Sequence, residues 1–557
     1  MNRCRDRERF RNVWEPLSLD DQNGGERRGE GFMEWVSDFF REDGYLFVVV
    51  IFAGFLSFAS FAYFYSNDLT LLNSDAIAHL LIAKRVLDGL TPGLAHLGGY
   101  WLPLPHILML PFVWSDFLFR TGLAGSFLSM ISFVLTAVFI YKLTSLTVGD
   151  GRVGLFAAVV FCGNPNVLYM QAIPMTEMVF LFFMVAAVYY LSKWGKNADD
   201  LLCLVLAAAM IASATLTRYE GWALFLLSLL MVLYVCVRKG FFAEKVQAYL
   251  IYFGSLAGLG ILLWLIWEQT ILGDFLFFHR GEYSNLSFTV DSELTGDFRL
   301  ALLSYWKATR MIVGSIALAM SLLGVIYFAF TNRLKINSLC LLVLFFPFPF
   351  FVYSLYSGQV EQKLPGLGNG GMYCIRYGLL MVPAVAIFIA FLLRNRWLQI
   401  LVVLVLLVNS FFMVRNGNIV TLNESAVTGI GPDGVSKMEG GLWLRENYDY
   451  GLTLVENKEH EPLVFWSSIP IDSFIYEGDR GYWEEALTDP EKHARWIVMS
   501  KWPDGPDKVW KALHGTDILK GAFDCVYRIS TSSRTTEFYK LNEGVSEVSH
   551  EPSNISK

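Results

Sequence analysis

Charged residues are scarce in this sequence, and their scarcity decides the class of protein. Only 17% of the 557 residues are charged and 54% are hydrophobic, whereas soluble domains carry roughly 25% charged residues. Apolar runs long enough to cross a bilayer, about 18 residues or more, recur along most of the chain. A soluble globular protein is therefore excluded, and the sequence predicts a polytopic α-helical membrane protein.

Several motifs that would assign a chemistry are also missing. The seven cysteines are scattered without a CxxC or HExxH pattern, so neither a disulfide framework nor a conventional zinc site has support. The Gly-rich stretch LPGLGNGGMY has no GxGxxG or Walker spacing, which argues against nucleotide-dependent chemistry. No basic stripe is interleaved with aromatic residues, and we expect no nucleic-acid partner.

The apolar runs predict about eleven transmembrane helices. They lie at Tyr45–Tyr65, Gly125–Leu143, Val153–Asn166, Met178–Leu191, Leu201–Leu216, Trp222–Val237, Val246–Leu272, Ile312–Phe330, Leu339–Tyr356, Tyr377–Leu393 and Leu398–Val414. With eleven spans, the short basic loops all fall on the side of the Arg-rich N-terminus. Because Lys and Arg concentrate in cytoplasmic loops, we expect a multi-pass protein of the cell membrane with a cytoplasmic N-terminus.

The order of these segments predicts four parts. We expect a disordered cytoplasmic segment over 1–31, an interfacial helix over 32–44, and a transmembrane domain over 45–414 with a first outer loop over 66–123. The remaining 415–557 would form an extracytoplasmic α/β domain, because strand-like and helical segments alternate there.

Within this last part the apolar runs suggest particular strands. We expect buried strands at Leu452–Glu456, Pro462–Trp466 and Arg495–Ser500, and a helix at Ile471–Glu477. Phe523–Ser530 and Thr536–Leu541 would form a closing hairpin.

Asp75 is the first candidate site residue, because it lies at the outer membrane face and opens an amphipathic helical run. An acid in the first helical turn often serves only as a cap or dipole partner. The alternative is a general base that deprotonates an acceptor hydroxyl. His79 lies on the same helix face, so this pair would also suit a divalent metal; the sequence indicates no other cofactor.

Four more charged residues are expected at span ends on the same side: Glu177, Arg218, Glu220 and Arg376. An acid that enters an apolar span marks a functional site by default, although Glu177 could also be a dipole partner only. Arg218 would either pair with Glu220 or bind a phosphate, which its guanidinium fits. Arg376 would bind the same phosphate or extend to lipid head groups.

Neighbouring residues complete the candidate set. Lys84 and Arg85 would add positive charge for a lipid phosphate, and His106 in YWLPLPH is either a structural corner or a side chain facing a substrate. The candidate substrate contacts are His79, His106, Tyr100, Trp101, Glu220 and Tyr377.

Together these segments resemble the GT-C superfamily of integral-membrane glycosyltransferases, nearest to its protein O-mannosyltransferase and lipid A aminoarabinose transferase branch. The resemblance covers 45–414 and rests on NSDAIAHLLIAKRVLDGL, YWLPLPHILML, PMTEMVFLFF, TLTRYEGWALF and MYCIRYGLLMVPA. The chain departs from O-mannosyltransferases in having one acid, not an adjacent acidic pair, in the first loop. It also lacks the WWDxG pattern of oligosaccharyltransferases.

The resemblance implies an inverting transferase that moves a sugar, with mannose favoured, from a polyprenyl-phosphate donor to an extracytoplasmic hydroxyl on a glycolipid, polysaccharide or protein. It implies Asp75 as the catalytic base, Glu177 as a second catalytic acid, and Arg218 with Arg376 on the donor phosphate. Membrane lipids would surround the chain. The alternative is a transporter or flippase for a lipid-linked sugar, but no inverted hydropathy repeat is visible.

Overall fold

The computed structural model describes residues 44–281, 284, 292–331, 336–368, 370–458, 460–503 and 505–542. The chain divides into two compact units, Met1–Val48 and Val49–Lys557, and only Gly44–Val48 of the first are described. The disordered segment expected over 1–31 and the interfacial helix expected over 32–44 therefore lie outside the described residues, except for Gly44, where helix α2 begins.

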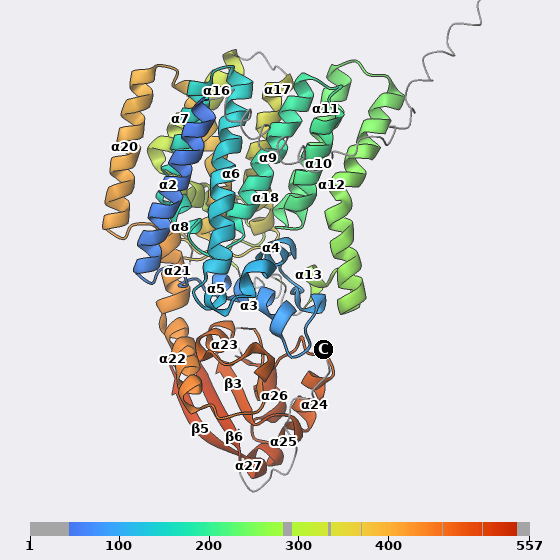
Figure 1. Ribbon diagram of the computed structural model, residues 1–557, viewed down its shortest axis with the longest axis vertical. Helices are drawn as coiled ribbons and strands as arrows, with labels where there is room; N and C mark the ends of the chain where they lie inside the picture. The colour runs from blue at the N-terminus through green and yellow to red at the C-terminus, as the bar shows by residue number, and fades with distance from the viewer. Residues whose placement is uncertain are drawn as a thin grey trace, which may run out of the picture. The chain divides into compact units, whose positions relative to one another are not determined.

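Long apolar helices make up most of the second unit (Figure 1). Among the described residues, seven are long and apolar enough to cross a membrane: α2 (Gly44–Ser66), α6 (Leu123–Val148), α9 (Glu177–Lys196), α11 (Glu220–Arg238), α12 (Ala243–Leu272), η3 with α19 (Ile375–Leu392), and α20 with α21 (Arg396–Ile430). An eighth forms if α15 (Phe298–Val313) and α16 (Ser315–Thr331), which are bent by 106° at their junction, count as one span.

The other three predicted spans coincide with shorter apolar helices: α7 (Gly151–Cys162), α10 (Leu201–Thr215) and η2 with α18 (Cys340–Tyr356). Helix α7 stops early because Asn164 caps a new helix, α8 (Pro165–Met170), by accepting from the backbone N–H groups of Asn166 and Val167. The polytopic helical class is confirmed, and the described residues contain seven or eight full-length spans where eleven were predicted.

The segment predicted as the first outer loop contains α3 (Ser74–Asp88), η1 (Leu94–His96), α4 (Leu104–Val113) and α5 (Asp116–Arg120), and it keeps this name below. Asn73 caps α3 by accepting from the backbone N–H of Asp75, which places this acid in the first turn. Every residue from Ala76 to Val86 is buried. Helix α3 is therefore enclosed by protein over most of its length.

The C-terminal domain is built around a mixed sheet, drawn in orange and red in Figure 1. Its strands are β1 (Thr453–Val455), β2 (Phe474–Ile475), β3 (Trp496–Trp502), β4 (Gly505–Pro506), β5 (Phe523–Ser530) and β6 (Thr535–Leu541). The order is β2-β1-β3-β6-β5, with β4 on β3. Strands β2, β1 and β3 run parallel, while β6 is antiparallel to both β3 and β5.

Both faces of this sheet are covered. Along β3, Trp496 and Val498 belong to one apolar cluster, while Ile497 and Met499 belong to another. Successive side chains of a strand point to opposite faces, so the two clusters lie on the two sides. The closing hairpin and the strands at β1 and β3 agree with the sequence prediction.

Two local predictions in this domain are wrong. The run Pro462–Trp466 is not a strand but lies in helix α23 (Glu461–Ser467). Proline suits the first turn of a helix. Because α23 is largely buried, apolar residues follow one another along it, and a short continuous apolar run is equally typical of a buried strand. The run Ile471–Glu477 forms a single 3-10 turn, η4 (Ile471–Ser473), followed by strand β2.

Helix α23 also joins the C-terminal domain to the first outer loop, because it packs against α3. One apolar cluster contains Leu80 and Phe119 of the loop together with Leu463 and Phe465 of α23. The rings of Phe119 and Phe465 lie 5.4 Å apart in an edge-to-face contact. Arg120 donates to the carbonyl oxygen of Phe465 at 3.0 Å. A continuous core thus docks the domain on the loop.

We expect Phe465→Ala to loosen this docking. The Phe465 side chain is buried, and truncating a buried Phe costs roughly 3–5 kcal/mol. Limited proteolysis should then cut near the start of the C-terminal domain faster than in the wild type. Tyr482→Ala, which removes an exposed ring of the same domain, is the control. Equal cleavage rates for Phe465→Ala and wild type would contradict the shared core.

Candidate active site

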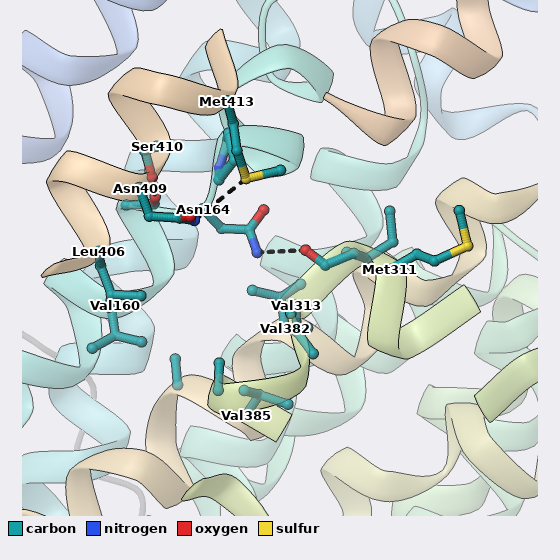
Figure 2. A pocket seen from close by; sticks show the side chains of 16 residues that line it. Val160, Asn164, Met311, Val313, Val382, Val385, Leu406, Asn409, Ser410 and Met413 are labelled. Carbon is teal, nitrogen blue, oxygen red and sulfur yellow. Dashed lines mark hydrogen bonds between the residues drawn. The ribbon is translucent and has the colours of Figure 1, made fainter. Parts of the chain in front are cut away.

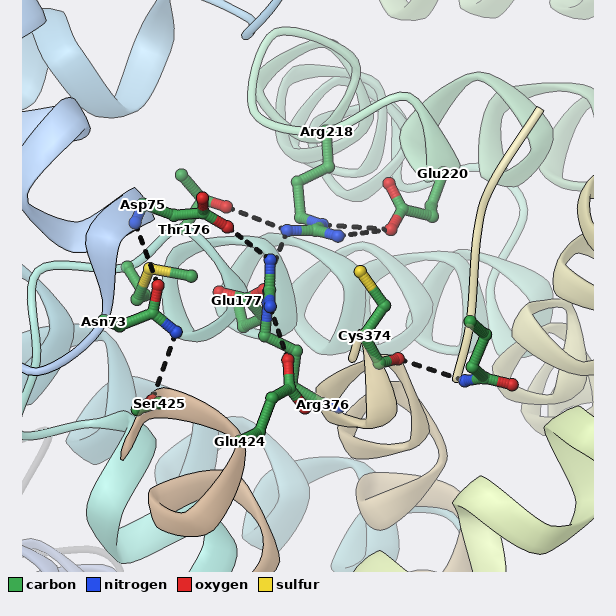
Figure 3. Close-up of polar contacts among 12 residues, drawn as sticks. Asn73, Asp75, Thr176, Glu177, Arg218, Glu220, Cys374, Arg376, Glu424 and Ser425 are labelled. Atoms are coloured by element: carbon green, nitrogen blue, oxygen red, sulfur yellow. Dashed lines mark hydrogen bonds and ion pairs between the residues drawn. The ribbon is translucent and has the colours of Figure 1, made fainter. Parts of the chain in front are cut away.

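Six charged side chains from distant parts of the chain meet at one place (Figure 3). They are Asp75 on α3, Glu177 on α9, Arg218 in the α10–α11 turn, Glu220 on α11, Arg376 on η3 and Glu424 on α21 (Val420–Ile430). The sequence predicted five of these six as site residues.

Arg376 lies at the centre of this cluster. Its Nη2 donates to Asp75 Oδ2 at 2.5 Å, its Nη1 to Glu424 Oε1 at 2.5 Å, and its Nε to Glu177 Oε1 at 3.2 Å. One guanidinium therefore contacts three carboxylates, each from a different helix. A guanidinium has five N–H groups, and these contacts use one each on Nε, Nη1 and Nη2. The second N–H of Nη1 and the second N–H of Nη2 are therefore left over when only contacts among the described residues are counted.

Arg218 forms the second half of the cluster. Its Nε and Nη2 donate to Glu220 Oε1 at 3.0 and 2.7 Å. Its Nη1 donates to Glu177 Oε1 at 3.0 Å and to Thr176 Oγ1 at 2.9 Å. The Glu177 oxygen thus bridges the two arginines. Its other oxygen, Oε2, is buried and has no hydrogen-bond partner among the described residues.

A tight turn brings Arg218 and Glu220 to this position. Helix α11 begins only five residues after α10 ends at Thr215. A Cβ atom on Gly221 would lie 2.4 Å from the carbonyl oxygen of Ala214, so only glycine lets the two helices approach this closely. The TRYEG segment is therefore shaped by packing as well as by charge.

The cluster carries more negative than positive charge. Four carboxylates face two guanidiniums, a formal excess of two negative charges. Three of the acids are almost fully buried, whereas 36% of the Asp75 side chain is exposed. Burying unpaired charge is costly, so each arginine is held by several acids at once. Asp75 is the acid of this group that a substrate can reach.

Two neutral histidines support the helix that carries Asp75. The ring of His79 packs against that of Trp101 in a tilted contact with ring centres 4.5 Å apart, and its Nδ1 is hydrogen-bonded to His106 Nε2 at 2.9 Å. Burial, together with the positive charges of Arg218 and Arg376, lowers the pKa of His79 to about 3. Burial also holds the pKa of His106 well below its usual value. Both rings are therefore neutral at physiological pH.

The aromatic candidates lie close to the charged cluster. The Tyr377 ring centre is 5.4 Å from the guanidinium carbon of Arg218 and 5.5 Å from that of Arg376, so it packs against both. The Tyr100 carbonyl accepts from the hydroxyl of Tyr219 at 3.0 Å. This contact connects the first outer loop to the turn that carries Arg218.

Lys84 and Arg85 do not join this cluster. They follow Asp75 by nine and ten residues on α3, which is roughly 14–15 Å along the helix axis. Lys84 pairs with Asp88 at 2.7 Å. Arg85 lies 4.0 Å from the ring centre of Tyr476 in the C-terminal domain. The structure thus places Arg85 against the C-terminal domain, whereas Lys84 pairs within the first outer loop.

Glu424 is the residue that the sequence interpretation missed. It lies ten residues after the last predicted span, in a segment assigned to the C-terminal domain. The available signal was that Glu424 is the one charged residue in 416–432. Its role became visible only because α21 folds back onto η3 and α8.

No metal-binding arrangement accompanies the acids. In the described parts of the chain, no group of three or more His, Cys, Asp and Glu could hold a metal ion. Asp75 Oδ2 accepts a hydrogen bond from Arg376, and His79 Nδ1 is hydrogen-bonded to His106. One candidate ligand atom on each residue of the expected Asp75–His79 metal pair is therefore already engaged by another side chain.

A largely apolar pocket lies among the membrane helices (Figure 2). It contains about 540 Å³ of empty space, including its open side, between α7, the α15–α16 bend, α19 and α20. Val160, Val385 and Leu406 are among its lining residues. Ile312, also on its wall, accepts from Asn166, which in turn accepts from the backbone N–H of Thr421 on α21. The pocket is thus connected to the helix that carries Glu424.

Comparison with known proteins bears on the fold. No protein-family model and no curated protein sequence matches the chain. The crystal structure of ArnT from Cupriavidus metallidurans bound to undecaprenyl phosphate matches with a TM-score of 0.57 and 14% identity, over 89% of this chain and 98% of that one. This chain shares the fold of that structure. The resemblance inferred from the sequence motifs is therefore confirmed at the level of architecture.

Two structures of the Archaeoglobus fulgidus oligosaccharyltransferase also match. The apo form has a TM-score of 0.48 at 12% identity, over 87% of this chain and 80% of that one. The complex with an inhibitory peptide and a dolichol-phosphate has a TM-score of 0.49 at 11% identity, over 88% and 80%.

We expect acid to destabilise the first outer loop of this protein. The pKa of His79 falls from 6.5 to about 3 on folding, so between these pH values the unfolded chain binds more protons. Stability should therefore fall as pH drops below about 6.5, by up to about 1.4 kcal/mol per pH unit for each such histidine. Thermal melting between pH 7.5 and 5 measures this slope.

The double variant His79→Gln, His106→Gln should reduce this pH dependence. His493→Gln, at a partly exposed histidine of the C-terminal domain, is the control and should leave it unchanged. An unaltered slope in the double variant would show that the pair does not titrate on unfolding.

Proposed function

We propose that this protein is a membrane glycosyltransferase that takes its sugar from a polyprenyl-phosphate donor and transfers it, with inversion, to an acceptor hydroxyl. The observation that carries the proposal is the contact between one partly exposed carboxylate, Asp75, and the buried guanidinium of Arg376 at the end of apolar helices. The ArnT structure, whose fold this chain shares, contains undecaprenyl phosphate, which supports a lipid-phosphate donor.

Asp75 is the general base in this proposal. It accepts the proton of the acceptor hydroxyl as the oxygen attacks the anomeric carbon, and the bond from that carbon to the phosphate oxygen breaks in the same step. Because the displacement is direct, one carboxylate is sufficient, unlike in retaining glycosidases, which use two. The polyprenyl phosphate leaves as an anion.

Arg376 and Arg218 stabilise that anion. The leftover N–H groups on Arg376 Nη1 and Nη2 can donate to phosphate oxygens, and such charge-assisted bonds are strongest where water is excluded. A phosphate that binds to the leftover N–H of Nη2 shares this nitrogen with Asp75, and its negative charge weakens the ion pair between Arg376 and Asp75. Donor binding would thereby free the base to accept a proton from the acceptor.

Glu177 has a different role in this proposal. Its Oε1 is held by both arginines, while its buried Oε2 has no partner among the described residues. Because the Glu177 side chain is fully buried, substrate does not reach it. We assign Glu177 to shaping the site, by holding both guanidiniums in place for the donor phosphate.

The apolar pocket fits the beginning of the donor's isoprenoid chain. Helix α20, which forms one wall, belongs to the least buried of the membrane-spanning segments. A lipid chain could therefore enter from the bilayer while its phosphate reaches Arg376. The C-terminal domain, docked on α3, would cover the site from the other side and help to select the acceptor.

The remaining parts of the proposal rest on the sequence. The basic loops place the N-terminus in the cytoplasm and the C-terminal domain outside a plasma or inner membrane. No nucleotide sugar is available there, so a lipid-borne donor is required. Mannose is the favoured sugar because of the resemblance to O-mannosyltransferases, and the acceptor is a glycolipid, a polysaccharide or a protein.

Replacing the base tests the first step. Asp75→Asn should lower the transfer rate by about 10²–10⁴-fold, the usual effect of removing a general base, while the protein still folds and binds donor. Transfer of radiolabelled sugar from polyprenyl phosphate by the purified protein measures this. Asp68→Asn makes the same change at an exposed acid seven residues upstream and should be silent. A wild-type rate in Asp75→Asn would disprove the assignment.

Replacing the arginines tests donor binding. Arg218→Lys and Arg376→Lys keep the charge but lose the planar set of N–H groups, so the KM for the donor should rise roughly 10- to 100-fold, as expected for lost hydrogen bonds to a charged group. Arg445→Lys, on an exposed position of α22 (Pro432–Asn447), is the control. If neither variant changes the donor KM, the two arginines only hold the acids together.

A further inference from the structure

We infer that Glu424 is a positioning residue of the active site, which acts through Arg376 to set where this guanidinium meets Asp75 and the donor phosphate. The inference rests on the proposed function, because it takes Arg376 as the phosphate ligand. Nothing in the sequence motifs pointed to this acid or to α21 as part of the site.

Glu424 holds Arg376 at two points. Its Oε1 accepts from Nη1 of the side chain at 2.5 Å, and its Oε2 accepts from the backbone N–H of the same residue at 2.9 Å. Both ends of Arg376 are therefore fixed by one carboxylate. The Glu424 side chain is only 1% exposed, so water does not compete for these contacts.

The backbone contact meets a need created by the fold. Cys374, which precedes η3 (Ile375–Met381), adopts a left-handed conformation with φ of 55°, which is uncommon for a residue other than glycine. The first N–H groups of a helix lack partners within it, and Arg376 lies in that first turn. Glu424 supplies the missing acceptor from a different helix.

Helix α21 also holds the other side of the Asp75–Arg376 contact. Ser425 Oγ accepts from Asn73 Nδ2 at 3.1 Å, and Asn73 is the residue that caps α3. The Thr428 carbonyl accepts from Ser74 Oγ at 3.2 Å. A Cβ atom on Gly429 would lie 2.0 Å from the Leu72 carbonyl oxygen. One short helix therefore sets both the start of α3 and the position of Arg376.

Glu424 is not a second base. Both of its oxygens are engaged by Arg376, and the side chain is buried, so an acceptor hydroxyl cannot reach it. Asp75, with more than a third of its side chain exposed, stays in that role. The effect of Glu424 must then pass through Arg376, and this gives the inference a distinctive test.

Glu424→Gln is the first variant. A glutamine has one acceptor oxygen and one NH₂ group, so it can satisfy one of the two N–H donors of Arg376 but must face the other with a donor. We expect kcat/KM for transfer to fall on the order of 10²-fold, the effect of displacing a catalytic group by about 1 Å. Glu446→Gln, an exposed glutamate of α22, is the matched control and should be silent.

A double-mutant cycle separates positioning from simple folding damage. In an Arg376→Lys background, adding Glu424→Gln should change the remaining activity by no more than about twofold, because the group it positions is gone. In an Arg218→Lys background, where Arg376 is intact, adding Glu424→Gln should still lower the activity by the full factor. If Glu424→Gln is equally harmful in both backgrounds, or harmless in the wild type, the inference is overturned.

A binding measurement replaces the activity assay where a variant is too slow to assay. Tryptophan fluorescence measures the affinity for undecaprenyl phosphate. Glu424→Gln should lower this affinity in the wild type and in the Arg218→Lys background, but not in the Arg376→Lys background. Glu424→Asp keeps the charge but is one methylene shorter, so its affinity for the lipid should lie between those of the wild type and Glu424→Gln. A wild-type affinity in Glu424→Asp would also count against the inference. A wild type that neither transfers sugar nor binds this lipid would instead refute the proposed function.

Discussion

The guanidinium of Arg376, buried among three carboxylates, is the interaction on which the rest of this site depends. Its partners come from α3, α9 and α21, which are separated from it by 301, 199 and 48 residues in the chain. Removing one member of a buried ion pair typically costs 3–5 kcal/mol, because the partner keeps its charge without compensation. The cluster therefore ties the first outer loop, a membrane helix and the segment before the C-terminal domain into one unit.

Helix α3 transmits this constraint to the C-terminal domain. Its first turn carries Asp75, and its far end carries Arg85, which stacks on Tyr476 of that domain. Between these ends its apolar residues share a core with α23. The C-terminal domain is thus packed against the same helix that carries Asp75. Fifteen residues of helix connect the charged cluster physically to this domain.

Hydropathy and charge in the sequence were sufficient for the architecture. The polytopic class and the location of all predicted spans follow from apolar runs, because each helix in a membrane must satisfy its own backbone hydrogen bonds and expose apolar side chains. Asp75, Glu177, Arg218, Glu220 and Arg376 could also be predicted, since a charge at the end of an apolar span is conspicuous. Pro462–Trp466 could not be assigned correctly, because a short helix buried on every side has no periodicity that distinguishes it from a buried strand.

The sequence by itself determined which residues are charged within an apolar chain, and hence most of the residues of the candidate site. Only the tertiary structure decided how they pair: that Arg376 contacts three acids, that Lys84 and Arg85 lie far from it on α3, and that Glu424 completes the cluster from beyond the last predicted span. Hydropathy is a local property of the chain, whereas these contacts arise from helices that return to one another across hundreds of residues. Glu424 was hidden for this reason, because a single acid in a polar connecting segment is ordinary until α21 folds back and buries it against Arg376.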